Sequence, residues 1–251
     1  MRLTLVMIMC GMIAVNVLGG ETTITINGKA IRTSGNNVTV NNEIVIVDGK
    51  VLSGQSGDVV KGSGKIATVK RDLGIFTELR QNISANVTVK AGTKSQCTIT
   101  ADENILPLIV TESLGNALQI TSKESYITSQ RVEIAIETPL LTRADMNGSG
   151  QMDISDVTKD KILLVLSGSG DISAKGQSAE LDAKINGSGN VHAEGLKAGV
   201  VKVIINGSGK AKVHATASLT TEIRGSGDII YTGSPAQFRS FVSGSGTVAK
   251  E

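Results

Sequence analysis

The sequence predicts an all-β protein built as a β-solenoid, a right-handed parallel β-helix with coils of about 19–20 residues. Three observations predict this class. A Gly-Ser-Gly motif recurs at near-constant spacing, apolar and polar residues alternate around each copy, and aromatic residues and proline are rare. Even spacing of this size is typical of proteins that are built from stacked repeats.

The motif sets the length of one coil. Seven copies occur, and the last six begin at Gly148, Gly168, Gly187, Gly207, Gly225 and Gly244, at steps of 20, 19, 20, 18 and 19 residues. Repeats that stack in this way pair each strand with its copy in the next coil, about 4.8 Å away.

Alternation around the motif predicts which side chains face inward. Apolar residues stand two before the first glycine and two after the last. The former are Met146, Leu166, Ile185, Ile205, Ile223 and Val242, and the latter are Met152, Ile172, Val191, Ala211, Ile229 and Val248. The residues that directly flank the motif are mostly polar. A period of two is typical of strands with one buried face.

The same alternation puts both glycines of each motif on the inward side and the serine on the outward side. We therefore expect a sharp corner where no inward side chain fits, which glycine tolerates. A second turn in each coil is expected near Gly176, Gly195, Gly199, Gly233 and Pro235. An antiparallel sandwich or meander is the alternative, because it also has short strands with turns every 8–12 residues.

Composition limits the classes of partner. The chain of 251 residues carries 29 glycines, 3 prolines and no tryptophan, and its net charge is +2. This length predicts one elongated domain, or one such domain with a small appendage. No basic stripe or aromatic platform is present in the sequence, which argues against a nucleic-acid partner.

The N-terminus predicts export. Arg2 precedes an apolar run from Leu3 to Leu18, and small residues follow it, so residues 1–20 are expected to be a signal peptide cleaved after Gly19 or Gly20. A retained membrane anchor is the alternative. After cleavage the protein is not expected to be an integral membrane protein. Cys97 would be its only cysteine, so no intrachain disulfide can form.

Residues 21–64 are expected to be a small β segment and a linker. Asn27-Gly28 predicts a hairpin turn between strands within 24–31, and further strands are expected at 38–47 and 51–52. Residues 54–64, rich in glycine and serine, predict the linker.

Residues 65–251 are expected to form the β-helical domain, of which 65–140 would be the first and less regular coils. Strands are expected at 76–80, 85–90, 96–100, 106–111, 117–121 and 132–137, with a short helical turn or loop at 102–107.

The chain also resembles a known family. The residues that carry the resemblance are Arg71-Asp72-Leu73-Gly74-Ile75-Phe76, Asn86-Val87-Thr88-Val89, Glu103-Asn104-Ile105-Leu106-Pro107 and the Gly-Ser-Gly array. Over roughly residues 65–235 they are similar to the head GIN domain family. The resemblance implies a β-helical, adhesin-like surface protein of Bacteroidetes-like bacteria. It implies no catalytic residues.

Motifs that suggest chemistry have simpler explanations. Asp171 and Asp228 follow the motif, but the residue at that position varies between coils, which argues against repeated calcium sites. The motif lacks the residues of a phosphate loop. His192 and His214 have no third ligand and are expected at the surface rather than in a zinc site.

Two classes of function remain. The first is a non-catalytic exported binding module, adhesin-like, in the periplasm, on the outer surface or secreted, with a glycan or a surface protein as partner. Its outward serines and their polar neighbours would form the contact face. The alternative is an enzyme that acts on an extracellular polysaccharide. Asp153, Asp156 and Asp160 are explained by a solvated loop, so no catalytic residue, metal ligand or cofactor is predicted, and the ligand-binding residues are not identified.

Overall fold

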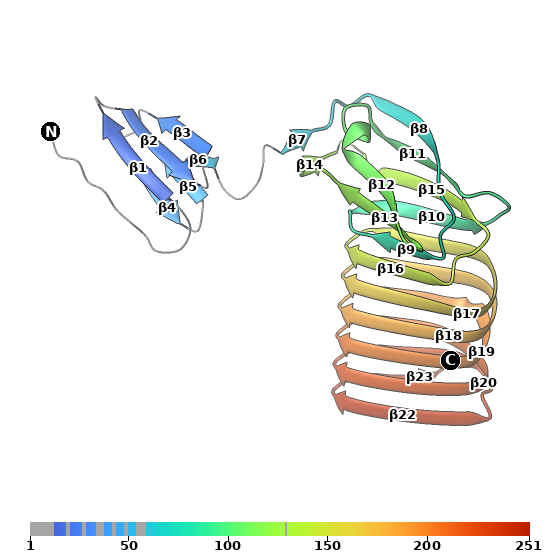
Figure 1. Cartoon of the computed structure of the whole chain (residues 1–251). Coiled ribbons are helices and arrows are strands. Elements are labelled where there is room, and N and C mark those ends of the chain that lie inside the picture. Colours follow the sequence, from blue (N-terminus) through green and yellow to red (C-terminus); the bar gives the residue numbers. More distant parts are fainter. Residues whose placement is uncertain are drawn as a thin grey trace. The chain divides into compact units, whose positions relative to one another are not determined.

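The computed structural model describes residues 59–128 and 130–251 in full and, before them, the backbone of six strands between residues 13 and 53. The chain divides into two compact units, Met1–Val59 and Val60–Glu251. Each unit is described separately (Figure 1).

The first unit contains two antiparallel sheets. One has the order β1-β2-β3 and the other β4-β5-β6. The strands are β1 (Ile13–Leu18), β2 (Glu21–Ile26), β3 (Lys29–Thr33), β4 (Val38–Asn41), β5 (Ile44–Val47) and β6 (Lys50–Ser53).

The predicted hairpin is confirmed, because β2 pairs with β3 up to Ile26 and Lys29. Its turn residues, 27–28, and the linker residues 54–58 lie outside the described residues. The stretch expected at 38–47 is divided into two strands, β4 and β5. In the uncleaved chain, β1 falls within the expected signal peptide and pairs with β2.

The second unit is almost entirely β-structure. Its elements are β7 (Val60–Lys61), β8 (Ile66–Asp72), β9 (Glu78–Gln81), β10 (Ala85–Ala91), β11 (Gln96–Asp102), η1 (Leu106–Leu108), β12 (Ile109–Leu114), β13 (Ala117–Ser122), β14 (Tyr126–Ile127), β15 (Val132–Thr138), β16 (Arg143–Gly148), β17 (Gln151–Gly168), β18 (Asp171–Gly187), β19 (Asn190–Gly207), β20 (Lys210–Gly225), β21 (Asp228–Gly233), β22 (Gln237–Gly244) and β23 (Thr247–Lys250).

These strands form a β-solenoid of about five coils, which confirms the predicted fold class. β17, β18, β19 and β20 are each one coil, and they pair in parallel with one another along their length. The Gly-Ser-Gly corners stack along one edge of the solenoid, at the arrowheads of β16 to β20 on the left of Figure 1. On the opposite edge, here called the arc edge, the chain bends between the first and second segments of each coil, on the right of Figure 1. The bends fall at about residues 156–160, 176–179, 195–199 and 216–217.

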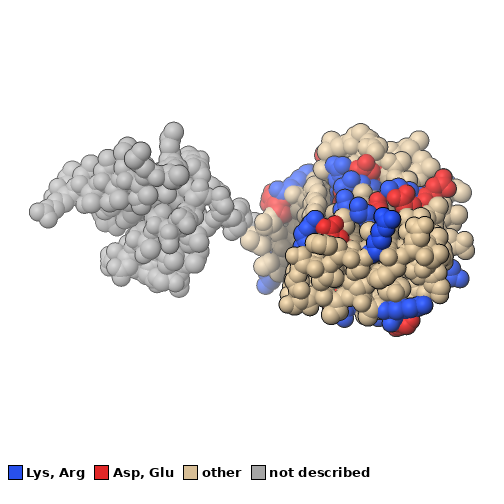
Figure 2. Space-filling view, turned by 90° about the horizontal axis from the view of Figure 1, so that it is seen from below, with Lys and Arg blue, Asp and Glu red and all other residues tan. Residues whose placement is uncertain are grey.

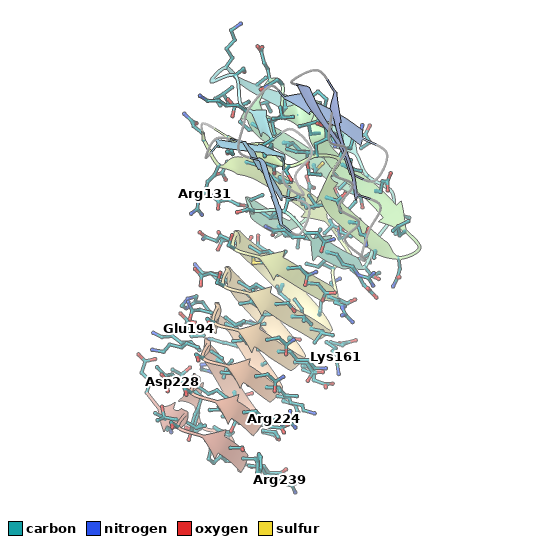
Figure 3. The ribbon with its side chains drawn as sticks, turned by 90° about the vertical axis from the view of Figure 1, so that its left-hand side faces the viewer. Arg131, Lys161, Glu194, Arg224, Asp228 and Arg239 are labelled. Carbon is teal, nitrogen blue, oxygen red and sulfur yellow. The ribbon has the colours of Figure 1, made fainter. Side chains whose placement is uncertain are left out.

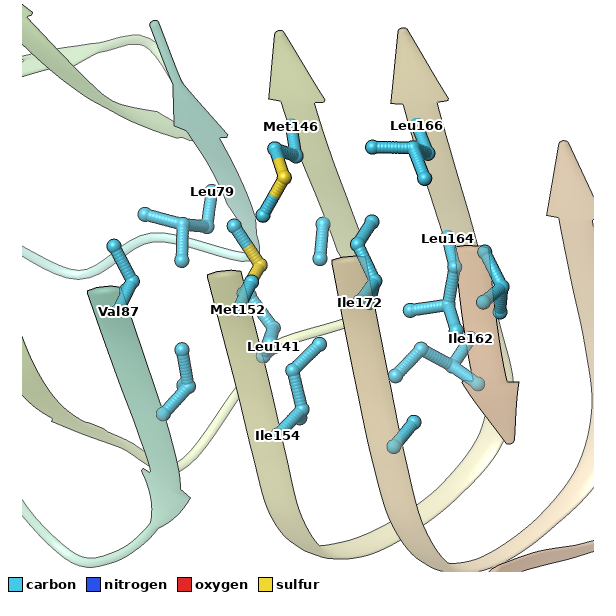
Figure 4. Packing of buried hydrophobic residues seen from close by; sticks show 14 of the residues in the cluster. Leu79, Val87, Leu141, Met146, Met152, Ile154, Ile162, Leu164, Leu166 and Ile172 are labelled. Carbon is cyan, nitrogen blue, oxygen red and sulfur yellow. The ribbon is translucent and has the colours of Figure 1, made fainter. Parts of the chain in front are cut away.

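Two walls connect these edges. The A wall contains β15, β10, the first segments of β17 to β20, then β21 and β23. The B wall contains β13, β9, β16, the second segments of β17 to β20, and β22. The walls enclose a core of Val, Ile, Leu, Ala and Met side chains, part of which is shown in Figure 4.

Burial confirms the predicted alternation in the inner coils. Leu166, Ile185, Ile205 and Ile223 have 0% of their surface exposed. In β22, at the outer edge of the B wall, the equivalent Val242 is 40% exposed. No strand among the described residues pairs with this outer edge, so the row of inward side chains that ends with Val242 is partly exposed to solvent there.

Residues 65–140 close the other end of the solenoid and correct an expectation. The prediction of irregular first coils is correct for β9, β10, β13 and β15, which pair in parallel within the two walls. It is wrong for β8, β11 and β12, here called the antiparallel cap: β11 pairs antiparallel with both β8 and β15, and β12 pairs antiparallel with β13. The expected helical turn is present as η1. Arg71 donates hydrogen bonds to the carbonyl oxygens of Leu106, the first residue of the turn, and Ile109, which follows it, at 3.1 and 2.8 Å.

Candidate functional site

The Gly-Ser-Gly corner is defined by backbone contacts between coils. The first glycine has a φ between +131° and +145° in all six copies of the array, a conformation that L side chains rarely adopt. Its carbonyl oxygen accepts two hydrogen bonds from the next coil: that of Gly168 accepts from Ser188 N at 3.0 Å and from Gly189 N at 3.1 Å. Main-chain hydrogen bonds therefore join the corners of adjacent coils.

The two glycines of each motif have different surroundings. The second glycine is buried, as predicted, in every copy but the last, and a Cβ on Gly189 would meet both the carbonyl oxygen of Gly170 and, at 2.7 Å, the side chain of Leu166 in the core. The first glycine is only half-buried. A Cβ on Gly187 would meet the backbone of Gly168 in the preceding coil rather than the core. The prediction that both glycines face inward is therefore correct for the second and wrong for the first.

The serine between the glycines is exposed in every copy of the array. These residues form one straight row along the corner edge, here called the serine ridge: Ser149, Ser169, Ser188, Ser208, Ser226 and Ser245. The hydroxyl of Ser84 lies 3.3 Å from that of Ser149 and extends the row toward the closed end of the solenoid. The predicted outward orientation of the serines is confirmed.

Polar side chains on both sides of the serine ridge bond to their copies in neighbouring coils. On the B-wall side, Asn206 Nδ2 donates to Asn186 Oδ1 at 2.9 Å, and Asn147 Nδ2 donates to Asn82 Oδ1 at 2.8 Å. On the A-wall side, Asn190 Nδ2 donates to Asp171 Oδ1 at 2.8 Å. These ladders fix the borders of the ridge and leave the serine hydroxyls between them facing solvent.

A hollow lies at the closed end of the ridge. It has a volume of about 530 Å³, and its lining includes Asn82, Ser84, Lys123, Glu124 and Tyr126. The phenolic oxygen of Tyr126 is buried without a hydrogen-bond partner, and burial raises the pKa of this group. No sequence motif indicates this hollow, because it depends on where the pairing of β12 with β13 places the segment 121–126.

Charged side chains lie on the outer faces of the walls. In Figure 3, Arg131, Glu194 and Asp228 lie along one margin of the solenoid, and Lys161, Arg224 and Arg239 lie along the other. Lys161 Nζ bonds Glu180 at 2.6 Å and lies 3.0 Å from Asp182, and these contacts raise the pKa of the lysine. On the face shown in Figure 2, basic and acidic side chains are interspersed.

The remaining residues singled out from the sequence are separated in space or bonded locally. His192 and His214 are half-buried on the outer side of the A wall, and His214 Nδ1 lies 2.8 Å from Thr232 Oγ1. Asp153 accepts a hydrogen bond from Gln151 at 2.8 Å. Within residues 59–128 and 130–251, no group of three or more His, Cys, Asp or Glu side chains could hold a metal ion.

A search for membrane-spanning helices among the described residues found none that is long and apolar enough. A search of the curated proteins found no significant match.

Solved structures share the fold. A "putative adhesin" from Bacteroides fragilis is 23% identical over 76% of this chain and 100% of its own, with a TM-score of 0.64. A "putative lipid binding protein" from Parabacteroides distasonis is 24% identical over 77% of this chain and 100% of its own, with a TM-score of 0.55. A "putative adhesin" from Parabacteroides merdae is 21% identical over 78% of this chain and 100% of its own, with a TM-score of 0.52.

The match to a family model is more specific than these similarities in fold. The family model matches residues 75–235, which include most of the antiparallel cap and most of the Gly-Ser-Gly array. It agrees with the resemblance carried by those motifs. The chain therefore belongs to the family described as "Putative auto-transporter adhesin, head GIN domain".

Proposed function

We propose that this protein is an exported, non-catalytic adhesin-like module that binds a glycan or a surface protein along the serine ridge. The observation that carries the proposal is the single row of exposed serine hydroxyls, bordered on both sides by polar side chains, several of which bond to one another between coils. The adhesin-like character follows from the family. The location of the contact face on the ridge is our inference.

The chemistry of the ridge suits an extended polar partner. A hydroxyl both donates and accepts hydrogen bonds, so the row can bond sugar hydroxyls or the backbone of a protein strand. Because the neighbouring coils hold the flanking amides in place, little conformational entropy is lost when a partner binds. The hollow beside Ser84, whose lining includes Lys123 and Glu124, would receive the end of such a partner.

Export is the second part of the proposal. An adhesin-like family is consistent with a protein exported to the surface. The basic residue and apolar run at residues 2–18 support a cleaved signal peptide, with the mature protein in the periplasm, on the outer surface or secreted.

The enzyme alternative requires acids and bases gathered around a substrate groove. The three aspartates that prompted it differ in surroundings: Asp153 bonds Gln151, Asp156 lies 3.9 Å from Lys90, and Asp160 is exposed. Nothing in this arrangement favours hydrolysis or elimination over simple binding.

A binding experiment and a turnover experiment test the proposal together. The exported protein is applied to a glycan array and to intact bacterial and host cell surfaces, and the same polysaccharides are then assayed for new reducing ends and unsaturated products. We expect retention of at least one glycan or surface protein without release of shortened chains. Release of shortened chains would establish the enzyme alternative, and no retention on any surface would remove the adhesin-like proposal.

A further inference from the structure

The stacking of the coils is interrupted at one place on the arc edge. On the side of β17 that faces the closed end, strand pairing stops at Ser155, which is opposite Lys90 of β10, and resumes at Leu163, which is opposite Arg143 of β16. In the next coil the equivalent arc is covered, because Val157 and Thr158 pair with Gly176 and Gln177 of β18. The cause is β10, which turns back at residues 92–95 into β11 instead of continuing to the B wall.

This interruption leaves a cavity of about 200 Å³. The buried part of its lining is apolar and comes from three segments: Val89 in β10, Leu141 after β15, and Ile154, Val157 and Ile162 in β17. Figure 4 shows Leu141, Ile154 and Ile162 beside one another at this end of the core. For scale, an apolar cavity of about 150 Å³ in another protein binds benzene.

One polar group lies in this apolar lining. Thr138 is only 2% exposed, and its hydroxyl has no hydrogen-bond partner. Buried hydroxyls in native proteins are nearly always hydrogen-bonded, so a buried hydroxyl without a partner indicates a missing one. The cavity therefore offers an apolar space and one unused hydrogen-bonding atom.

The rim of the cavity is polar, and its charges are engaged locally. β17 carries a bulge between Ile154 and Val157, and Asp156 within it has a φ of +59°. The Asp156 carboxylate lies 3.9 Å from Lys90 Nζ, and Lys159 Nζ donates to the carbonyl oxygen of Pro139 at 2.7 Å. Bulges are over-represented beside functional sites. These contacts leave no single uncompensated charge that would select a charged ligand.

We infer that this cavity binds a small neutral amphiphile, with an apolar body of about six carbons in the pocket and one hydroxyl or carbonyl oxygen bonded to Thr138. The inference is independent of the serine ridge, which lies on the opposite edge of the solenoid. The size of the apolar body follows from the comparison with benzene, and its single oxygen follows from the unpartnered hydroxyl.

Phenol and benzene are suitable probes, because they differ by the one hydroxyl that Thr138 would recognise. Each is titrated into the full chain labelled with ¹³C at the Ile, Leu and Val methyl groups, and chemical shifts are followed by NMR. We expect both probes to shift the methyl resonances of Val89, Leu141 and Ile154, and phenol to bind several-fold more tightly than benzene.

Four variants make the test specific. Thr138→Val should remove the preference for phenol, Thr138→Ser should retain it, and Val157→Trp should abolish binding of both probes by filling the pocket. Thr221→Val is the matched control, because Thr221 is also buried with an unpartnered hydroxyl but lies in the regular B wall. It should leave both affinities unchanged.

Three results would overturn the inference. One is that neither probe shifts methyl resonances of the lining, which would mean that the cavity is empty or holds water that phenol does not displace. The second is that phenol binds the Thr138→Val and wild-type proteins equally. The third is an effect of Thr221→Val as large as that of Thr138→Val. The Thr138 hydroxyl would then affect binding through the stability of the fold and not through contact with the probe.

Discussion

The carbonyl oxygen of Gly168 occupies the space into which a Cβ on Gly187 would project. The same oxygen accepts hydrogen bonds from Ser188 and Gly189, the two residues that follow Gly187. The close approach that excludes a side chain is thus the approach that joins the corners of adjacent coils. The relationship repeats between Gly187 and Gly207, and between Gly207 and Gly225 the carbonyl oxygen of Gly207 again occupies the Cβ space and accepts a hydrogen bond from Ser226.

This relationship predicts a difference between two glycines of the same conformation. Gly148 has a φ of +145° but nothing within 4 Å of its would-be Cβ, whereas Gly187 has a φ of +136° and meets the Gly168 backbone. Gly148→Ala should lower the free energy of unfolding by about 1–3 kcal/mol through backbone strain. Gly187→Ala should lower it by about 1–3 kcal/mol more through overpacking.

Chemical denaturation of both variants measures the two losses. Ser188→Ala is the control at the same corner and should stay within about 0.5 kcal/mol of wild type, because its side chain is exposed. Equal losses for the two glycine variants would show that contact between the coils does not restrict the first glycine.

Alternation along β19 predicts unequal effects of neighbouring substitutions. Ile205 is fully buried, so Ile205→Ala should cost about 2–5 kcal/mol of unfolding free energy. Asn206 faces outward and bonds Asn186 at 2.9 Å, so Asn206→Ala should cost about 1 kcal/mol or less. Urea denaturation of both variants checks this, and an equal or larger loss for Asn206→Ala would mean that the inner and outer faces have been exchanged.

The regular coils could be predicted because each one repeats the same local requirement. Leu166 and Ile185 stand at one position of the period and pair with each other in the structure. The antiparallel cap could not be predicted in the same way. β8 is half-exposed along its length, so its alternation is weak, and nothing local to residues 92–95 indicates whether the chain continues or reverses.

The two candidate sites also differ in how far they could be predicted from the sequence. The serine ridge is a property of the repeat, so its outward orientation followed from the positions of Ser188 and Ser208 alone. The cavity beside Thr138 arises where β10 leaves the coil path, and its lining combines residues about 70 positions apart in sequence, such as Val89 and Ile162. Contacts between such distant segments carry no local signal.

The closed end of the solenoid should become less stable in acid. Burial alone would raise the pKa of Glu78, but hydrogen bonds from Arg80 and Asn116 outweigh it and hold this pKa below its ordinary value. A lowered pKa in the folded state means that the ionised form contributes stability. That contribution is complete above the unfolded pKa of about 4.3 and is lost as the pH falls through the folded value.

Urea denaturation between pH 7 and pH 3 tests the role of Glu78. Glu78→Gln should make the decline in unfolding free energy below about pH 4.3 shallower, since glutamine does not titrate. Glu112→Gln, on the exposed part of β12, is a control for the removal of one acidic group. A decline as steep in Glu78→Gln as in the wild type would contradict this assignment.

The thiol of Cys97 should be protected in the folded protein. The residue is 2% exposed in β11, and burial raises the pKa of its thiol. Reaction with Ellman's reagent at pH 8 should therefore be at least about a hundredfold slower in native protein than in guanidinium chloride, because the reactive thiolate must be both formed and reached. Rapid reaction of the native protein would place β11 at the surface.

Export should produce a mature N-terminus near residue 20. The basis is Arg2 followed by the apolar run, and N-terminal sequencing of the exported protein decides the cleavage position. Thiol titration of the unfolded protein gives an independent count: one thiol, Cys97, after cleavage, and two, Cys10 and Cys97, before it. An exported protein that retains Met1 in a membrane fraction would favour the anchor instead.

The central claim is that the glycines of each corner maintain the fold while the serines make contact with the partner. The most direct measurement is the affinity of the Ser188→Ala, Ser208→Ala, Ser226→Ala triple variant for the glycan or surface protein retained by the wild type, together with its thermal unfolding. The matched control replaces Thr158, Gln177 and Lys197 by alanine, because these three exposed residues align in successive coils on the arc edge.

The serine variant should unfold at the wild-type temperature and bind at least about tenfold more weakly, as the loss of three hydrogen bonds would give. The arc variant should bind as the wild type does. Unchanged affinity in the serine variant, or a larger loss in the arc variant, would contradict the claim and exclude the ridge as the contact face.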